Sequence, residues 1–354
     1  MRPLTTDDHN VSALEVTANC DEASWDGYVH AHPAASGYHL MAWRQVVEKA
    51  FGHRTFYLMA KDEHGEVRGV LPLFFLSSRL FGRFLVSMPF LNYGGILADN
   101  PEAQAALLAS AVDVAKGLEA SHIELRHQES SDMGWPNKQH KVSMRLELPC
   151  QFEVLWKGFS AKLRSQIRRA QKEGMTVRIE GNELLEDFYR LFSRNMRDLG
   201  TPVYARKFFE TILQTFPKET RIGIVYWKDR PLAGGLLYGF RNMLEIPWAS
   251  SDRRYNHLAP NMLLYSSVLE YACRQGFRIF DFGRSTPDSG TFHFKEQWGA
   301  RPVPLHWYYW LASGETLPDL SPRNPRYDLG IKLWQRLPIA VTRCLGPFIS
   351  PYLP

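Results

Sequence analysis

The two halves of this chain repeat one order of predicted elements, and this repetition constrains the fold more than any other feature. Each half contains a helical pattern, two apolar runs joined by a short turn, a second helix and a closing strand. In the first half these segments are residues 39–51, 55–76, 101–120 and 122–127. In the second half the helical pattern covers residues 184–200 and 205–216, and the later segments are 221–240, 259–276 and 277–283, with a further strand at 243–250. The order predicts an α/β (α+β) protein whose mixed, mainly antiparallel sheets are flanked by helices.

A chain of 354 residues is long enough for two domains, which agrees with a duplication. Unrelated strand-turn-strand-helix units also resemble one another, so the alternative explanation for the repeat is chance similarity. We favour duplication. We expect an N-terminal domain at 1–150, a C-terminal domain at 151–315 and a tail at 316–354.

The composition describes an ordinary globular protein. Apolar residues make up 45% of the chain and charged residues 22%, which excludes intrinsic disorder. The net charge, 42 − 37 = +5, is too small to indicate a nucleic-acid-binding protein. The four cysteines lie far apart and show no metal-ligand spacing, so we expect reduced thiols and no metal site. The polar N-terminus lacks the pattern of a secretory signal, which favours a cytoplasmic protein.

Two apolar segments could be mistaken for membrane spans. Residues 70–97 are interrupted by Arg79, Gly82 and Arg83, which fits buried strands joined by a basic turn. Residues 329–354 contain prolines and three basic residues. This second segment is either a tail packed on the body or a peripheral contact with the inner face of a membrane.

A basic segment separates the two copies. Ser160 and Gly174 predict the start and end of a helix at 160–174. The segment contains one acidic residue, Glu173, and five basic residues, which are Lys162, Arg164, Arg168, Arg169 and Lys172. Positions four apart share one helical face, where like charges repel, so we favour phosphate binding over a merely solvated surface.

The richest stretch for chemistry is 252–300. A loop with Arg253 and Arg254 opens onto a helix that begins near Pro260, and free N–H groups at such a helix end bind phosphate, with Asn261 in the first turn. The strand at 277–283 ends next to Arg284. Ligands gather at such strand ends in α/β sheets.

Alternation in 292–295 predicts a strand, with Phe292 and Phe294 on one side and His293 and Lys295 on the other. Lys295 could therefore converge with Asp281 on a ligand. Solvation of Lys295, or a purely structural pairing of Asp281 with Lys295 or Arg284, is the alternative.

Several motifs in this order resemble the FemABX family of aminoacyl-tRNA-dependent peptidyltransferases, and more closely the FemAB-related proteins of exosortase (PEP-CTERM) and exopolysaccharide systems. They are the basic KLRSQIRRA helix, NMRDLGTPVYARKFF, PLAGGLLYG, RYNHLAPN, DFGRS and FHFKEQWGA. The resemblance covers residues 38–311. It implies two tandem N-acetyltransferase-like (GNAT) domains and transfer of an acyl or aminoacyl group to an amine.

The resemblance also assigns residues. The family motif F-K-x-x-[FW]-G falls on Phe294, Lys295, Trp298 and Gly299, so its functional lysine is Lys295. Acyltransferases of the N-acetyltransferase superfamily bind the coenzyme A pyrophosphate with a loop of the pattern Q/R-x-x-G-x-G/A, which reads Arg254-x-x-His257-x-Ala259 here. The long helical arm of the FemABX cell-wall members that use tRNA is missing.

The residues and the resemblance together define a candidate site. The catalytic candidates are Lys295, Glu245 and Asp281, and His293 is a further candidate for the base that accepts the amine proton. Phosphate or substrate would be bound by Lys162, Arg164, Arg168, Arg169, Arg253, Arg254, Asn261, Arg284 and His293. No permanent cofactor is expected; acyl-CoA or aminoacyl-tRNA is the expected co-substrate.

The expected acceptor is an amino-sugar or peptide precursor of a surface polymer, lipid- or nucleotide-linked. The alternative is a non-catalytic scaffold that holds such an intermediate at the membrane.

Overall fold

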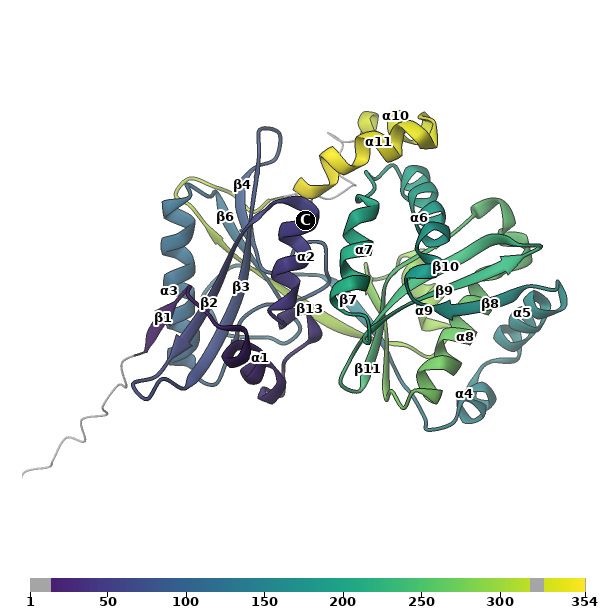
Figure 1. The fold of residues 1–354 in the computed structure, drawn as a ribbon, viewed down its shortest axis with the longest axis horizontal. Coiled ribbons are helices and arrows are strands. Elements are labelled where there is room, and N and C mark those ends of the chain that lie inside the picture. Colours follow the sequence, from purple (N-terminus) through teal and green to yellow (C-terminus); the bar gives the residue numbers. More distant parts are fainter. Residues whose placement is uncertain (1–13, 319–327, 354) are drawn as a thin grey trace, which may run out of the picture.

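One mixed sheet runs through the whole molecule (Figure 1). The computed structural model describes residues 14–318 and 328–353. In this part of the chain thirteen strands form the sheet, in the order β1-β2-β3-β4-β6-β13-β7-β12-β11-β10-β9-β8, and β5 pairs with β3. The prediction of a mixed, mainly antiparallel sheet flanked by helices is confirmed.

The helix and strand segments predicted for the two copies correspond to elements of the structure with similar bounds. The strands are β1 (Glu15–Thr17), β2 (Arg54–Lys61), β3 (Val67–Ser78), β4 (Gly82–Val86), β5 (Leu97–Ala98), β6 (His122–His127), β7 (Asn137–Glu147), β8 (Thr176–Glu180), β9 (Thr220–Trp227), β10 (Arg230–Phe240), β11 (Met243–Ser251), β12 (Ile279–Ser285) and β13 (Arg301–Leu311). The α-helices are α1 (Glu22–Ala31), α2 (Ala42–Phe51), α3 (Pro101–Gly117), α4 (Phe152–Gly158), α5 (Ala161–Lys172), α6 (Leu185–Leu199), α7 (Arg206–Thr215), α8 (Pro260–Arg274), α9 (Gly290–Glu296), α10 (Asp328–Arg336) and α11 (Ile339–Ile349).

Each half of the sheet contains one parallel pair among antiparallel neighbours. In the first half β4 runs parallel to β6, and in the second half β11 runs parallel to β12. The connections between these pairs pass through α3 and α8, as a parallel pair requires. The repeated order read from the sequence is therefore also a repeated topology.

Two strands join the halves at the centre of the sheet. β13 lies between β6 of the first half and β7, and β7 lies between β13 and β12 of the second half. The sheet thus continues across residue 150. The division into 1–150, 151–315 and 316–354 stays a prediction.

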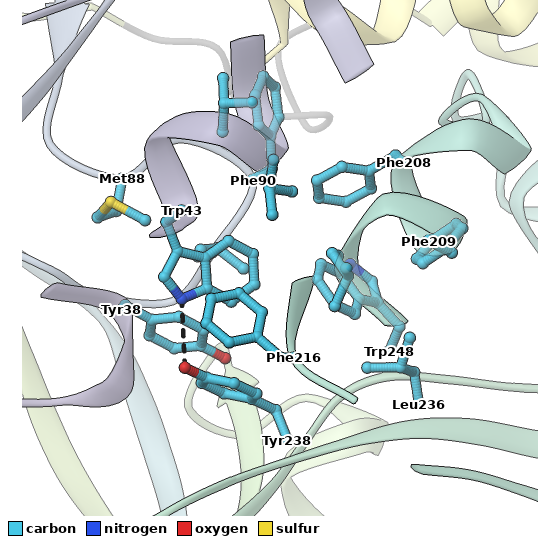
Figure 2. Close-up of a cluster of buried hydrophobic side chains, with 14 of the residues drawn as sticks. Tyr38, Trp43, Met88, Phe90, Phe208, Phe209, Phe216, Leu236, Tyr238 and Trp248 are labelled. Atoms are coloured by element: carbon cyan, nitrogen blue, oxygen red, sulfur yellow. Dashed lines mark hydrogen bonds between the residues drawn. The ribbon is translucent and has the colours of Figure 1, made fainter. Parts of the chain in front are cut away.

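Helices cover both faces of the sheet. The helices α2, α6 and α7 pack on one face, in an aromatic-rich core that includes residues of both halves. In Figure 2, Trp43 of α2 lies against Tyr38 and Phe216, and its indole N–H points to the Tyr238 hydroxyl. α3 covers the other face in the first half, and α5 and α8 cover it in the second half.

Local sequence signals explain where the helices begin. Ser160 caps α5 by accepting a hydrogen bond from the Leu163 N–H, so the predicted basic helix is confirmed. Pro101 and Pro260 occupy the first turn of α3 and α8, where proline needs no N–H partner.

The predicted strand at 292–295 is wrong, because these residues belong to α9 (Gly290–Glu296). Ser289 caps this helix through the Phe292 N–H. A four-residue alternation is too short to distinguish a strand from one helical turn when a capping serine precedes it.

The C-terminal segment forms α10 and α11, which pack against α6. A side chain at Gly346 would meet the backbone of Val203, so glycine permits this close approach. No helix in the described ranges, 14–318 and 328–353, is long and apolar enough to cross a membrane.

Candidate active site

Two buried carboxylates lie side by side where the parallel strands of the second half meet. Glu245 of β11 and Asp281 of β12 are register partners, and their side chains are 2% and 0% exposed. The neighbours Leu244 and Ile246 pack into the core under α8, so alternation sends Glu245 to the opposite face, toward the first half. Two of the three predicted catalytic residues are therefore adjacent.

The hydrogen-bond partners of Glu245 come from the first half of the chain. The hydroxyls of Tyr38 and Tyr93 donate to its Oε2 at 2.8 and 3.0 Å, and the Asn92 amide donates to its Oε1. All three partners are buried. The site is thus shared by both halves, and neither half contains it alone.

Asp281 is held by partners from β7 and from its own strand. The Ser143 hydroxyl lies 2.6 and 2.5 Å from its two oxygens, and the Arg145 Nε lies 3.2 Å from Oδ2. The Gly283 N–H donates to Oδ1 at 2.7 Å. The Tyr93 hydroxyl is 3.3 Å from Asp281 Oδ2, so it lies between the two carboxylates.

The two carboxylates differ in the support they receive. Burial, and then the neighbouring charge of Asp281, raises the pKa of Glu245 to about 8, while the three donors act in the opposite direction. Asp281 has the Arg145 guanidinium as a counterion. The raised pKa of Glu245 lies close to neutral pH, which suits this carboxyl to acid-base chemistry.

Lys295 reaches the same region from α9. Its Nζ donates to the carbonyl oxygens of Gly283 and Arg284 at 2.9 and 3.0 Å, and the side chain is buried. Burial lowers its pKa to about 8, against the opposing charges of Asp281 and Glu245. Lys295 therefore lies at the end of β12, as predicted, but it is carried there by a helix and not by the predicted strand.

A polar cavity adjoins this network. Its volume is about 180 Å³, and its lining includes Gly94, Gly95, His127 and Gln128. The Arg145 guanidinium donates to the Gln128 side chain as well as to Asp281. Arg145 therefore links the cavity wall to the carboxylates.

Other predicted site residues lie away from the carboxylates. Lys162, Arg168 and Arg169 are exposed on α5, and the last two line a surface hollow of about 460 Å³ with Lys172. Arg164 donates to the carbonyls of Lys157 and Phe159, so it also braces the turn between α4 and α5.

His293 is exposed on α9 and pairs with Glu296 at 3.3 Å. The Asn261 side chain donates to Ser251 Oγ at the start of α8.

A basic surface surrounds the loop before α8. The residues 253–258 form a 3₁₀ turn, and Asp252 pairs with Arg254 at 2.5 Å and with Arg194 at 3.8 Å. A hollow of about 350 Å³ beside it is lined by Arg190, Arg194, Lys228, Asp229, Arg230 and Asp252, among others. Ala259 adopts a left-handed conformation (φ 57°) at the position before Pro260. Ala259 thus adopts the positive φ for which glycine is usually required.

Sequence reasoning missed the first-half residues of the site. Tyr38, Asn92 and Tyr93 lie more than 150 residues from Glu245, and no local pattern links them to it. The N-Y-G-G run at 92–95 was the available signal, because two glycines after two polar side chains mark a tight, non-repetitive turn.

Comparison with known proteins agrees with this architecture. Residues 157–296 match the family model for the acetyltransferase (GNAT) domain. The matched segment lies in the second half of the chain and includes Glu245, Asp281 and Lys295. No curated protein matches the chain.

Solved structures resemble the chain over most of its length. A structure described as FemX has a TM-score of 0.65 and 18% identity, and the match covers 84% of this chain and 97% of that one. L-PGS from Bacillus licheniformis has a TM-score of 0.55 and 14% identity, over 92% and 97%. A tandem GNAT protein from the clavulanic acid biosynthesis pathway has a TM-score of 0.55 and 14% identity, over 86% and 100%. At these identities the matches show the fold, which is that of tandem GNAT proteins.

Proposed function

We propose that this protein transfers an acyl or aminoacyl group from a phosphate-bearing donor to an amine, at the carboxylate pair of Glu245 and Asp281. The observation that carries the proposal is the buried Glu245, with a pKa of about 8, at the junction of the two halves of a tandem GNAT fold. Amide formation by acyl transfer needs a group that accepts a proton near neutral pH. Glu245 has this property, and a solvent-exposed glutamate does not.

The proposed step starts from the ionised form of Glu245. The amine nitrogen attacks the donor carbonyl carbon, a C–N bond forms, and the carbonyl oxygen takes up negative charge. Tyr93 accepts the amine proton as it passes its own hydroxyl proton to the Glu245 carboxylate. The bond from the carbonyl carbon to the sulfur or oxygen of the donor then breaks, the carbonyl forms again, and the leaving group takes the proton from Glu245, which returns to its ionised form. Glu245 is nearly fully buried, as are Tyr38 and Tyr93. We propose Tyr93 as the relay because it precedes Gly94, which lines the polar cavity.

Lys295 is proposed as a positioning residue with an electrostatic role. Its ammonium holds the backbone carbonyls of residues 283 and 284, at the bulge of β12 that carries Asp281. Lys295→Arg would keep the charge and Lys295→Met would keep only the length. We expect Lys295→Met to lower kcat more than it raises KM, with partial recovery in Lys295→Arg.

The donor phosphates are proposed to bind at the basic surface beside α8. Arg194, Arg230, Arg253 and Arg254 lie around the loop that leads into this helix. The free N–H groups of a helix start and the arginine side chains suit a pyrophosphate. Acyl-CoA and aminoacyl-tRNA both present phosphates, and the basic face of α5 offers a second contact for the longer donor.

An amino-sugar or peptide precursor of a surface polymer, lipid- or nucleotide-linked, is proposed as the acceptor. The motif resemblance to FemAB-related proteins of exosortase and exopolysaccharide systems and the fold match to FemX support this class. The second candidate function is a scaffold that holds such an intermediate without reacting. A scaffold would use the same cavity but would need no proton acceptor. The pKa of Glu245 favours the enzyme.

The test is a transfer assay with a defined panel. Acetyl-CoA, longer acyl-CoAs and aminoacyl-tRNA are offered as donors, with UDP-linked amino sugars and peptide precursors as acceptors, and product is detected by mass spectrometry. Glu245→Gln should lower kcat by about 100-fold or more if it accepts the proton, since general-base catalysis contributes about 10² to 10⁴. Glu63→Gln, on an exposed turn, is the matched control. Full activity of Glu245→Gln would overturn the assignment, and donor binding without any product would support the scaffold.

A further inference from the structure

Two arginines, one buried and one partly buried, share one tryptophan ring where the halves meet. The guanidinium carbons of Arg126 and Arg284 lie 4.4 and 5.1 Å from the ring centroid of Trp307. Arg126 is on β6, Arg284 on β12 and Trp307 on β13, so three strands converge here. Arg126 and Trp307 are buried, and Arg284 is partly buried.

Only one of the two arginines has a counterion. Arg126 Nε pairs with Glu124 at 2.7 Å, and its Nη1 donates to the Leu91 carbonyl at 3.0 Å. Glu124 also accepts from the Tyr309 hydroxyl at 2.9 Å, so this carboxylate is fully engaged.

Arg284 forms no ion pair within the described ranges, and its Nη1 is buried without a hydrogen-bond partner. The Trp307 indole N–H is buried without a partner as well.

Lys295 adds positive charge near Arg284, because its ammonium donates to the Arg284 carbonyl. The carboxylate of Glu124 acts in the opposite direction, but it already pairs with Arg126. Burial, and then the charge of Arg126, lowers the pKa of Arg284 to about 10. An uncompensated buried charge is costly, so a native protein that keeps one usually has a ligand for it.

We propose that Arg284 and Trp307 bind an oxyanion, a carboxylate or phosphate group of the amine acceptor. This inference rests on the proposed function for the identity of the molecule that carries the anion. A guanidinium with a free edge binds such groups through paired N–H donors, and the indole N–H supplies another donor. Ser143, the register partner of Arg284, also holds Asp281, so the anion would lie one strand pair from the carboxylates.

Anion binding is tested without any transfer reaction, so its failure is separate from failure of the proposed function. The melting temperature of the full chain is measured against inorganic phosphate and against acetate, with chloride at equal ionic strength as reference. At about ten times its Kd, a specific anion should raise the melting temperature by roughly 2 °C. The anion that protects more identifies the group.

Arg284→Met should abolish this protection. Arg54→Met, an exposed arginine stacked 5.3 Å from the Phe56 ring, is the matched control and should keep it. Arg284→Lys keeps the charge without the forked donors and should lose most of the protection, which covers a failure of Arg284→Met to fold. Equal protection in the Arg284 variants, or no protection of the wild type by either anion, would overturn the inference.

The C-terminal helices α10 and α11 present apolar side chains on their outward face. Gly346 and Thr342 of α11 face the body, whereas Val341, Leu345 and Phe348 lie on the outward face, at spacings of four and three residues. Phe348 is 74% exposed. α10 repeats the pattern with Leu329, which is 70% exposed, and Leu333.

The tip of the β3–β4 hairpin adds a further apolar group. Leu80 at this tip is 85% exposed, and in Figure 1 the hairpin and the two helices extend to the same, upper side of the molecule. Lys332 and Arg336 on α10 and Arg79 beside Leu80 form no ion pair within the described ranges. Apolar side chains flanked by unpaired cations complement an anionic lipid surface.

We infer that α10, α11 and the hairpin tip dock on an anionic membrane surface. The full chain is sedimented with vesicles of phosphatidylcholine containing 30% phosphatidylglycerol, and with phosphatidylcholine alone. We expect binding to the anionic vesicles, and a loss of about 100-fold in Leu345→Ser/Phe348→Ser from the apolar area removed. Val154→Ser, an exposed valine of α4, is the control and should bind like the wild type. Absence of vesicle binding, or a concentration-dependent dimer that the double variant abolishes, would overturn this inference.

Discussion

The proton on Glu245 should make the stability of the protein depend on pH in a predictable direction. The folded-state pKa of about 8 is above the unfolded value of 4.5, because the carboxyl is buried beside Asp281. A group with a raised folded pKa contributes stability that is fully present below pH 4.5 and lost as the pH rises through 8. At about 1.4 kcal/mol per pH unit, the contribution lost over this shift is on the order of 5 kcal/mol.

Glu245→Gln removes the titrating group and keeps its size. The variant should therefore lose less free energy of unfolding than the wild type between pH 5 and 8.5. Lys295 does not disturb this comparison, because its lowered pKa of about 8 affects stability mainly at higher pH. The lowered pKa of His39 affects both proteins equally, so it cancels in the difference.

Urea denaturation at pH 5, 7 and 8.5, followed by tryptophan fluorescence, measures the difference directly. The free energy of unfolding of Glu245→Gln relative to the wild type should rise by a few kcal/mol over this range. Glu63→Gln should show a constant difference near zero. A pH-independent difference for Glu245→Gln would refute the claim that burial holds the proton on this carboxyl.

Three further changes test the packing around the site. Trp43→Ala removes a fully buried tryptophan of the aromatic layer in Figure 2 and should cost about 3 to 5 kcal/mol in urea denaturation. Gly95→Ala places a Cβ 2.4 Å from the ring of His127, and should cost roughly 1 to 3 kcal/mol and perturb the cavity. Gly27→Ala, inside α1 with nothing within 4 Å, is its matched control and should raise the free energy of unfolding by up to about 1 kcal/mol.

Local elements could be read from the sequence because their signals are local. Helix α5 is fixed by a capping serine and a closing glycine within fifteen residues, and its bounds were predicted correctly. The parallel strands were also found, because β11 and β12 alternate apolar and polar positions around Glu245 and Asp281. Glu245 and Asp281 were both predicted as catalytic candidates. They are adjacent because they are register partners in the parallel pair of β11 and β12.

The remaining parts of the site depend on contacts between distant segments. Tyr93 comes to Glu245 from a turn in the other half of the chain, and Arg145 comes to Asp281 from β7. Neither β7 nor β13 has a clear strand signal. β7 begins with five polar residues, and β13 contains Pro302 and Pro304, which disfavour a central strand. The register of these strands cannot be predicted without their partners.

The placement of β7 and β13 explains why the site forms at the junction. β7 supplies Ser143 and Arg145 to the carboxylate on β12, and β13 supplies Trp307 between the arginines of β6 and β12. If each half closed its own sheet, these side chains would lie at two separate edges. Because the two strands pair with each other at the centre, one continuous sheet holds the polar groups of both halves on one face. A duplicated fold thereby acquires an asymmetric site, in which the second half provides the carboxylates and the first half provides the hydrogen-bond donors that hold them.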